Sequence, residues 1–292
     1  MPHLLRRLSV AISMVSALAA GCAAHSDPGR TATNVAAPSS STPRPAVDDA
    51  LVQLVARVEG DLGGQVGVAI ADGQHVAHAG LSGDSPVWST IKVPIAIAAL
   101  EKARESGQQT GWLEALARQA ITISDNDAAT ALWQSLGTTA ESATAVETLV
   151  GELGGDINVT DALAGRPGAP FGRARWPLTD QAQFAAQLPC SAPARRVYEL
   201  MGDIDPSQRD GFGHVRGAHF KGGWNADAEL GAYTYRQFGT LAGPHGPVGV
   251  AVIVHPEVSS HVGAVELLDA MAKGVAEIVD DGDFVGCRPA AG

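Results

Sequence analysis

Apolar residues recur at helical spacing near both ends of the folded part of the chain. Over residues 48–59 they fall three and four positions apart on one face, at Leu51, Leu54, Val55 and Val58. Over residues 262–279 a second stripe has similar spacing, at Val265, Leu268, Ala272, Val275 and Ile278. This spacing predicts two amphipathic helices, each with one buried face.

Shorter apolar runs predict strands in two regions of the chain. Residues 65–71 and 74–79 flank the turn dipeptide Asp72-Gly73, an arrangement typical of a β-hairpin. The later strand candidates are residues 217–224, 229–238 and 248–255. The chain therefore contributes strands from both of its ends.

The segment between the early and late strands has a helical pattern. It runs from Ser89 to about residue 188, with loops expected at 106–107 and across 158–176. The expected fold class is α+β, because strands from both ends can form one sheet around a helical middle. We predict an antiparallel sheet flanked by the terminal helices, with an all-helical subdomain, about residues 89–200, inserted into it.

Residues 1–21 have the pattern of a signal peptide. Arg6 and Arg7 precede an apolar run over 8–20 that is too short to span a bilayer comfortably. The run that ends at Cys22 resembles a bacterial lipobox, although Ala19 stands where such sequences usually have Leu. An ordinary secretory signal cut nearby is the alternative. We expect an exported protein, lipid-anchored through Cys22 to the outer face of the cell membrane.

Residues 22–46 are rich in Ala, Ser, Thr and Pro, a composition that favours a flexible linker over a packed core. The folded domain is expected over 47–292. It contains two cysteines, Cys190 and Cys287, and an oxidising compartment permits a disulfide between them.

The charge balance restricts the partners of the chain. A net charge of −11 over 292 residues argues against nucleic acid as a partner. No His or Cys spacing suggests a metal site, and His75 and His78 would point to opposite faces of a strand. No cofactor is expected.

Ser89 and Lys92 form the first chemical motif, directly before an Ala-rich apolar stretch. A serine hydroxyl needs a nearby base to become a nucleophile. Residues three apart share one face of a helix, so the Lys92 amine can lie beside the Ser89 oxygen. A serine N-cap followed by a chance lysine is the simpler alternative for so common a motif.

Two further clusters follow in the chain. Ser124-Asp125-Asn126 lies between two predicted helices, and Lys221-Gly222-Gly223-Trp224 lies on the first late strand. Each has a structural alternative: a helix N-cap for the first and a glycine bulge for the second. Each cluster alone is weak evidence of chemistry. Because both follow Ser89 and Lys92 in this order, the three motifs together strongly indicate a catalytic site.

With these three clusters, the chain resembles the penicillin-recognising serine hydrolases, which share the β-lactamase/D,D-peptidase-like fold, and it is nearest to class A β-lactamases. The resemblance covers roughly residues 47–281 and is closest over 119–129 and 89–92. It favours a β-lactamase-related lipoprotein of actinobacterial, for example mycobacterial, origin. The ligand that it implies is a β-lactam or a peptidoglycan stem peptide.

The resemblance implies acyl transfer, with Ser89 as the nucleophile and Lys92 as its base. It also implies that Ser124 passes a proton to the leaving nitrogen and that Lys221 polarises the site. The backbone N–H groups of Ser89 and Trp224 would form the oxyanion hole. The substrate-binding residues implied are Asn126, Gly222, Gly223 and Trp224.

Two departures from the family pattern bear on activity. Gly222 stands where the family has a Thr or Ser hydroxyl for the substrate carboxylate, a contact that Arg216 or Arg236 would have to replace. The loop over 161–177 lacks the Glu that activates the hydrolytic water, and Asp161 is its only acid. Ser124 also follows Ser89 more closely than in class A enzymes, which implies a trimmed helical subdomain.

Three function classes remain open. The first is an envelope serine hydrolase that forms an acyl-enzyme on Ser89 with β-lactam or D-Ala-D-Ala-like amides, with weak or absent deacylation. The second is a non-catalytic lipoprotein of the same fold that binds cell-wall fragments or a protein partner. The third is another serine hydrolase, such as an amidase, glutaminase or esterase, because fold does not determine function.

Overall fold

A five-stranded antiparallel sheet forms the centre of the computed structural model, which describes residues 44–164, 171–227 and 231–287. The strand order is β2-β1-β5-β4-β3, so strands from both ends of the chain meet at the β1–β5 pair. The strands are β1 (Gln65–Ala71), β2 (Val76–Gly80), β3 (His219–Asp227), β4 (Ala232–Gly243) and β5 (Gly246–His255). The α+β fold with an antiparallel sheet is therefore confirmed.

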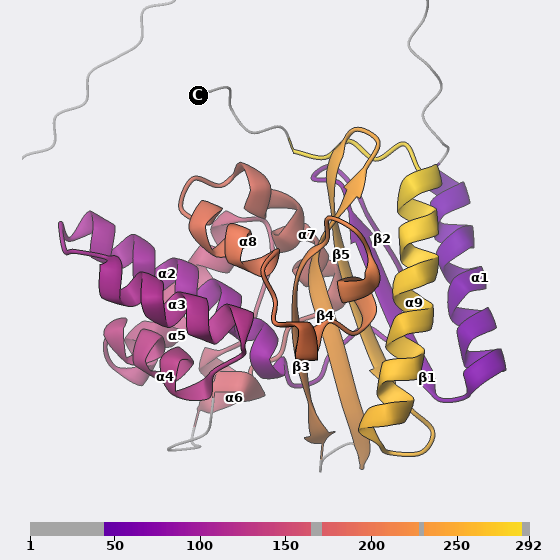
Figure 1. Cartoon of the computed structure of the whole chain (residues 1–292), viewed down its shortest axis with the longest axis horizontal. Coiled ribbons are helices and arrows are strands. Elements are labelled where there is room, and N and C mark those ends of the chain that lie inside the picture. Colours follow the sequence, from indigo (N-terminus) through magenta and orange to yellow (C-terminus); the bar gives the residue numbers. More distant parts are fainter. Residues whose placement is uncertain (1–43, 165–170, 228–230, 288–292) are drawn as a thin grey trace, which may run out of the picture. The chain divides into compact units, whose positions relative to one another are not determined.

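The two terminal helices, α1 (Arg44–Leu62) and α9 (His261–Asp281), pack against each other and against the sheet (Figure 1). The predicted stripe of α1 is buried, from Leu51 to Val58. Gly274 allows the close approach of the two helices, since a Cβ there would lie 2.2 Å from a Leu54 methyl carbon. Both helices begin earlier than the apolar stripes suggest.

The two faces of the sheet are covered by different helices. Arg236 of β4 hydrogen-bonds to Gln181 of α7 (Leu178–Gln187), whereas the ring of its neighbour Tyr235 stacks near His261 of α9. Adjacent residues of a strand point to opposite faces. It follows that α7 covers one face and α9 the other.

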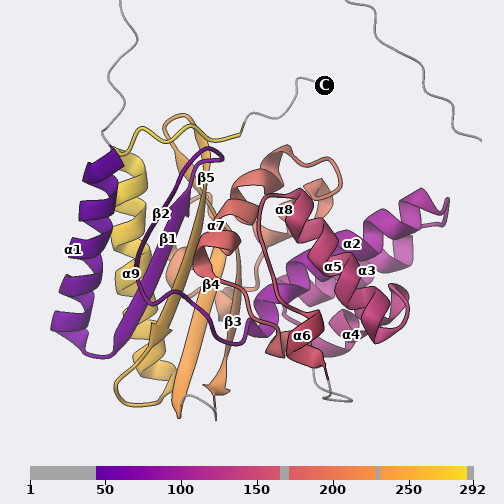
Figure 2. The ribbon, with the colours of Figure 1, turned by 180° about the vertical axis from the view of Figure 1, so that it is seen from behind.

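Except for α7, the helices between β2 and β3 gather beyond the β3 edge of the sheet, as the two opposite views show (Figures 1 and 2). They are α2 (Lys92–Glu105), α3 (Gly111–Thr122), α4 (Asn126–Ser135), α5 (Thr139–Glu152), α6 (Thr160–Leu163) and α8 (Arg195–Met201). Helix α2 is their centre, since most of its side chains are buried. The expected loop over 158–176 also contains α6 and the short 3-10 helix η2 (Phe171–Arg173).

The late strands are longer than their apolar runs predict. Strand β3 continues to Asp227, which pairs with Ala232, and β4 continues to Gly243, which pairs with Gly246 of β5. Polar residues at a hairpin end join the ladder through their backbone, which side-chain hydropathy does not report.

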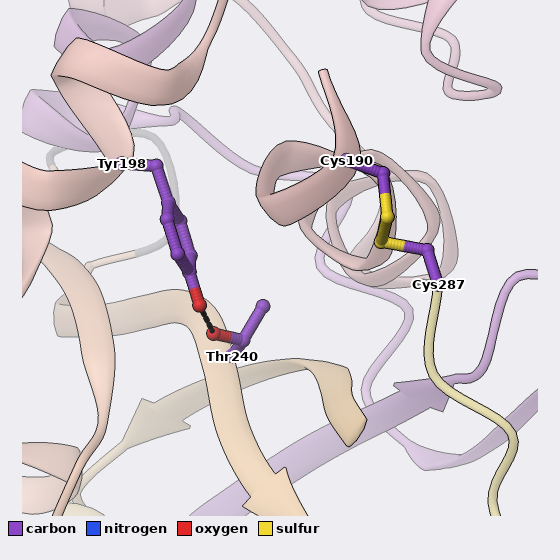
Figure 3. The surroundings of a disulfide bond; sticks show 4 residues. All are labelled: Cys190, Tyr198, Thr240 and Cys287. Carbon is purple, nitrogen blue, oxygen red and sulfur yellow. Dashed lines mark hydrogen bonds between the residues drawn. A yellow bond between two sulfur atoms is a disulfide. The ribbon is translucent and has the colours of Figure 1, made fainter. Parts of the chain in front are cut away.

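A disulfide joins Cys190 and Cys287, with 6.1 Å between their Cα atoms (Figure 3). It ties the segment after α9 to the 3-10 helix that follows α7. Nearby, the hydroxyls of Tyr198 and Thr240 share a hydrogen bond of 2.9 Å. The predicted signal peptide, Cys22 and most of the linker lie outside the described residues, and no described helix is long and apolar enough to cross a membrane.

Candidate active site

Ser89 lies in the 3-10 turn η1 (Trp88–Ile91), which leads directly into α2 at Lys92. The turn is closed by the Thr90 hydroxyl, which donates to the carbonyl of Val87 at 2.6 Å. Ser89 is half-buried, while Thr90 and Lys92 are buried. The serine is thus held at the start of the most buried helix and keeps contact with solvent.

Ser124 lies in the loop between α3 and α4, with φ of +58°. The next residue, Asp125, caps α4 by accepting the N–H of Ala128 at 2.7 Å. Within the described ranges, Ser124 and Trp88 are the non-glycine residues with positive φ. Such conformations persist where the surroundings impose them, and they cluster at functional sites. One lies beside the candidate nucleophile and the other at the candidate proton shuttle.

Two lysines converge on Ser124. The Lys92 ammonium donates to the Ser124 carbonyl at 2.5 Å, to the Ser124 hydroxyl at 3.2 Å and to Asn126 Oδ1 at 2.7 Å. The Lys221 ammonium donates to the same hydroxyl at 3.0 Å and to the Gly222 carbonyl at 2.8 Å. The structure therefore brings Lys92, Ser124, Asn126 and Lys221 into one hydrogen-bond network.

Burial changes the acidity of both lysines. It lowers the pKa of Lys92 to about 8, although the nearby Asp125 carboxylate raises it in part. Burial also lowers the pKa of Lys221 well below its ordinary value, and the charge of Lys92 lowers it further. A lysine with a pKa near neutrality can act as a general base.

Ser89 and Lys92 do not make the direct side-chain hydrogen bond that the sequence predicts. Within the described part of the chain, no hydrogen bond joins the Ser89 hydroxyl to the Lys92 ammonium, which is occupied by the three oxygens of Ser124 and Asn126. Catalytic hydrogen bonds are often long in unliganded enzymes and tighten when substrate binds.

Strand β3 meets Ser89 at Gly223. A Cβ at this position would lie 2.7 Å from the Ser89 nitrogen and 3.0 Å from the Thr90 nitrogen, so only glycine fits without displacement. Because β3 is the edge strand, its outer edge faces this turn and not another strand. The backbone of Trp224 is thereby brought close to the candidate nucleophile.

Tyr235 occupies the space beside Gly222. A Cβ on Gly222 would lie 3.3 Å from Tyr235 Cε2 and 3.6 Å from the Tyr235 hydroxyl oxygen. The Tyr235 ring is buried, and its hydroxyl donates to Asp210 Oδ2 at 3.3 Å. Burial, followed by the negative charge of Asp210, raises the Tyr235 pKa, so the phenol keeps its proton. Tyr235 was missed in the sequence, although it pairs with Trp224 across the predicted hairpin.

Arg236 does not replace the lost hydroxyl, contrary to one expectation. Its guanidinium is buried on the opposite face from Tyr235, where it donates to Trp176 O at 2.7 Å and to Gln181 Oε1 at 2.7 Å. It also donates to carbonyls of the segment that precedes η1, at Gly83, Ser85 and Pro86. The other candidate, Arg216, is exposed and lines a cavity of about 440 Å³ with Glu199 and His219.

In the described part of the loop over 161–177, the residues shown next to η1 include a cation and no acid. A Cβ on Gly172 of η2 would lie 3.3 Å from the Trp88 carbonyl oxygen, and the Arg173 guanidinium lies 5.7 Å from the Trp88 ring centroid. Asp161, the only acid of the loop, is exposed at α6. An arginine at Trp88 cannot serve as the base for a hydrolytic water.

The site has the components of acyl transfer: a serine, two lysines, a second serine and a strand edge. An arrangement of these groups can transfer an acyl group from an amide or ester to a serine. In the described part of the chain, no group of His, Cys, Asp and Glu side chains could hold a metal ion.

Comparisons with known proteins identify structures with the same fold but no protein of similar sequence. No protein-family model and no curated protein sequence matches the chain. A class A β-lactamase from Bacteroides cellulosilyticus is similar in structure, with a TM-score of 0.66, 16% identity, and coverage of 80% of this chain and 98% of that one. A β-lactamase from Burkholderia vietnamiensis has a TM-score of 0.60 and 19% identity over 77% and 94% of the two chains. One from Chitinophaga pinensis has a TM-score of 0.59 and 17% identity over 77% and 97%. The chain has the fold of class A β-lactamases.

Proposed function

We propose that this chain, which has the class A β-lactamase fold, is a serine hydrolase of the β-lactamase/D,D-peptidase type that forms an acyl-enzyme on Ser89. Its substrates are amide carbonyls such as those of β-lactams or D-Ala-D-Ala-like peptides. The proposal is supported chiefly by one observation, the shared hydrogen bonding of the Lys92 and Lys221 ammonium groups to the Ser124 hydroxyl. Packing alone does not account for two buried lysines at one serine.

The acylation step uses these groups in turn. Neutral Lys92 takes the Ser89 hydroxyl proton while Ser89 Oγ bonds to the carbonyl carbon. The carbonyl oxygen takes up negative charge near the backbone N–H groups of Ser89 and Trp224. As the carbon–nitrogen bond breaks, the Ser124 hydroxyl gives its proton to the leaving nitrogen and regains one from the protonated Lys92. Asn126 hydrogen-bonds to the acyl side of the substrate.

Deacylation is proposed to be slow. The residues of η2 shown to approach Trp88 are Gly172 and Arg173, neither of which can deprotonate a water. Residues 165–170 contain no acid either. The acyl-enzyme is therefore expected to accumulate.

Intact-protein mass spectrometry after incubation with a penicillin tests the proposal, with Ser89→Ala as the control. We expect an adduct of one penicillin that persists for hours and is absent from the control. Turnover without accumulation would refute slow deacylation but not acylation. If neither an adduct nor turnover is seen with penicillins and simple esters, the acyl-transfer proposal fails.

A non-catalytic binding protein is the second candidate, and Gly222 favours it. The glycine leaves the third motif without a hydroxyl, and Tyr235 fills the adjoining space. Such a protein would bind a cell-wall fragment or a protein partner at the same site. Binding of a peptidoglycan stem peptide that is equal in the protein and in Ser89→Ala, without any adduct, would support it.

We also propose that the protein is exported and anchored by lipid on Cys22 to the outer face of the cell membrane. The support is the charge and hydropathy pattern of residues 1–22. Cys22→Ser should release the protein from the membrane fraction, whereas an ordinary secretory signal would make this substitution silent.

A further inference from the structure

Four aromatic rings form a cluster at β3, the strand that carries the proposed oxyanion donor of Trp224, and we call this cluster the aromatic shelf. They come from three elements: Trp224 of β3, Tyr233 and Tyr235 of β4, and His261 of α9. The Trp224 and Tyr235 ring centroids lie 5.0 Å apart, and His261 lies 6.0 Å from Trp224 and 5.8 Å from Tyr235. Tyr235 is buried, whereas Trp224 and Tyr233 are partly exposed and His261 is exposed.

The position of the shelf relates it to the substrate. Trp224 follows Gly223, where an added Cβ would lie 2.7 Å from the Ser89 nitrogen, so the shelf begins one residue from the candidate oxyanion hole. Residues two apart on a strand share a face, so the Trp224 ring lies on the side to which a Gly222 side chain would point. In the resemblance described above, that side receives the substrate carboxylate.

The same side is poorly suited to a negative charge. The Tyr235 hydroxyl is directed to Asp210, so its proton is engaged and a carboxylate lies just behind it. The Arg236 guanidinium is on the other face of β4, held by backbone carbonyls. The Lys221 ammonium is buried and bound to Ser124 and Gly222. A substrate carboxylate would therefore meet aromatic carbon and a nearby negative charge.

We propose that the leaving-group side of the site takes an uncharged group with a flat apolar or aromatic face, stacked on Trp224, in place of a carboxylate. The substrate class is a neutral amide or ester that carries an aromatic leaving-side substituent. Stacked aromatic pairs contribute beyond the area that they bury. This inference rests on the acyl-transfer function proposed above, because it takes the reacting carbonyl to lie at Ser89.

Binding to Ser89→Ala protein tests the inference without acylation. The probes are one cephalosporin as its free acid, its methyl ester and its benzyl ester, titrated by calorimetry. We expect the benzyl ester to bind about tenfold more tightly than the free acid, and about threefold or more tighter than the methyl ester, the range of one aromatic pair. Equal or tighter binding of the free acid would overturn the inference.

Matched tryptophan variants locate the effect. Trp224→Leu in the Ser89→Ala background keeps an apolar side chain and the backbone N–H but loses the ring, so the preference for benzyl over methyl should disappear. Trp112→Leu on α3, where Trp112 is 54% exposed, should leave the preference intact. An unchanged preference in Trp224→Leu would overturn the role of the shelf.

Mass spectrometry of the protein with Ser89 intact separates this inference from the proposed function. Adducts that form fastest with the benzyl ester support both. Adducts that form fastest with the free acid support acyl transfer and overturn the proposed role of the aromatic shelf. Tight benzyl ester binding to both proteins with no adduct supports the shelf and contradicts acyl transfer.

Discussion

The burial of Lys92 determines the pH at which Ser89 can become a nucleophile. Only the neutral amine can accept the serine proton, and burial lowers its pKa to about 8. The acylation rate should therefore rise as the pH is raised through about 8 and level off above it. Stopped-flow or quenched-flow acylation by a penicillin measures this profile. A rate that falls over the same interval would contradict the base role of Lys92.

Asp125→Asn offers a sharper form of this test. The Asp125 carboxylate raises the Lys92 pKa, and its removal should shift the midpoint of the pH profile downward. Asparagine is also a good N-cap, so the bond to the Ala128 N–H is kept and α4 should remain folded. A midpoint that does not move would show that Lys92 is not the group titrating in the profile.

Gly223 is the residue at which the strand and the nucleophile touch. Gly223→Ala would place a methyl group 2.7 Å from the Ser89 nitrogen and displace a proposed oxyanion donor. We expect acylation to slow by about 100-fold or more, the usual effect of losing one such donor. Gly151→Ala in α5 is the control, because nothing lies within 4 Å of its added Cβ. Equal acylation rates in Gly223→Ala and Gly151→Ala would show that the backbone N–H groups of Ser89 and Trp224 do not form the oxyanion hole.

At the scale of elements, Arg236 ties three segments together. From β4 it reaches the segment before η1, the residue Trp176 before α7, and Gln181 within α7. Arg236→Met would leave these buried oxygens without a donor, and we expect the free energy of unfolding to fall by about 3–5 kcal/mol.

Urea denaturation measures this change, and Arg118→Met is the matched control. Arg118 donates to Asp203 at 2.9 Å, but both side chains are at least half exposed. Loss of this ion pair should therefore lower the free energy of unfolding by about 1 kcal/mol or less. A similar small loss in both variants would mean that the carbonyls bound by Arg236 find other donors.

Much of the element order follows from local pattern. The apolar stripe of α1, the hairpin at Asp72-Gly73 and the core of β5 each depend on residues near one another in sequence. Helix α6 and the hairpin end at Asp227 escaped prediction, because they are set by backbone hydrogen bonds and by packing with distant segments.

The candidate site was predictable only in part, for a related reason. Ser89, Lys92, Ser124 and Lys221 carry recognisable spacing or order, but the orientation of Arg236 depends on the register between β3 and β4. A shift of one residue would have exchanged Tyr235 and Arg236 between the faces of the sheet. The role of Tyr235 could therefore be found only once the pairing of Trp224 with it was known.

At the scale of the whole molecule, the disulfide constrains the chain far from the site. Cys190 and Cys287 are separated by 97 residues, and Cys287 follows Gly286, which touches Pro247 at the β4–β5 turn. That turn begins after Gly243, roughly 23 Å along β4 from Arg236 at the usual rise per residue. The bond is thus positioned to affect stability and not chemistry.

The double variant Cys190→Ser/Cys287→Ser tests this separation. Loss of a cross-link over so long a loop should lower the free energy of unfolding by about 2–5 kcal/mol, because the unfolded chain gains freedom. The acylation rate at 25 °C should change by less than about twofold, since the rate depends on groups whose geometry the bond does not set. Denaturation and adduct formation are measured on the same preparations. A large fall in rate with unchanged stability would mean that the disulfide holds the site and not the fold.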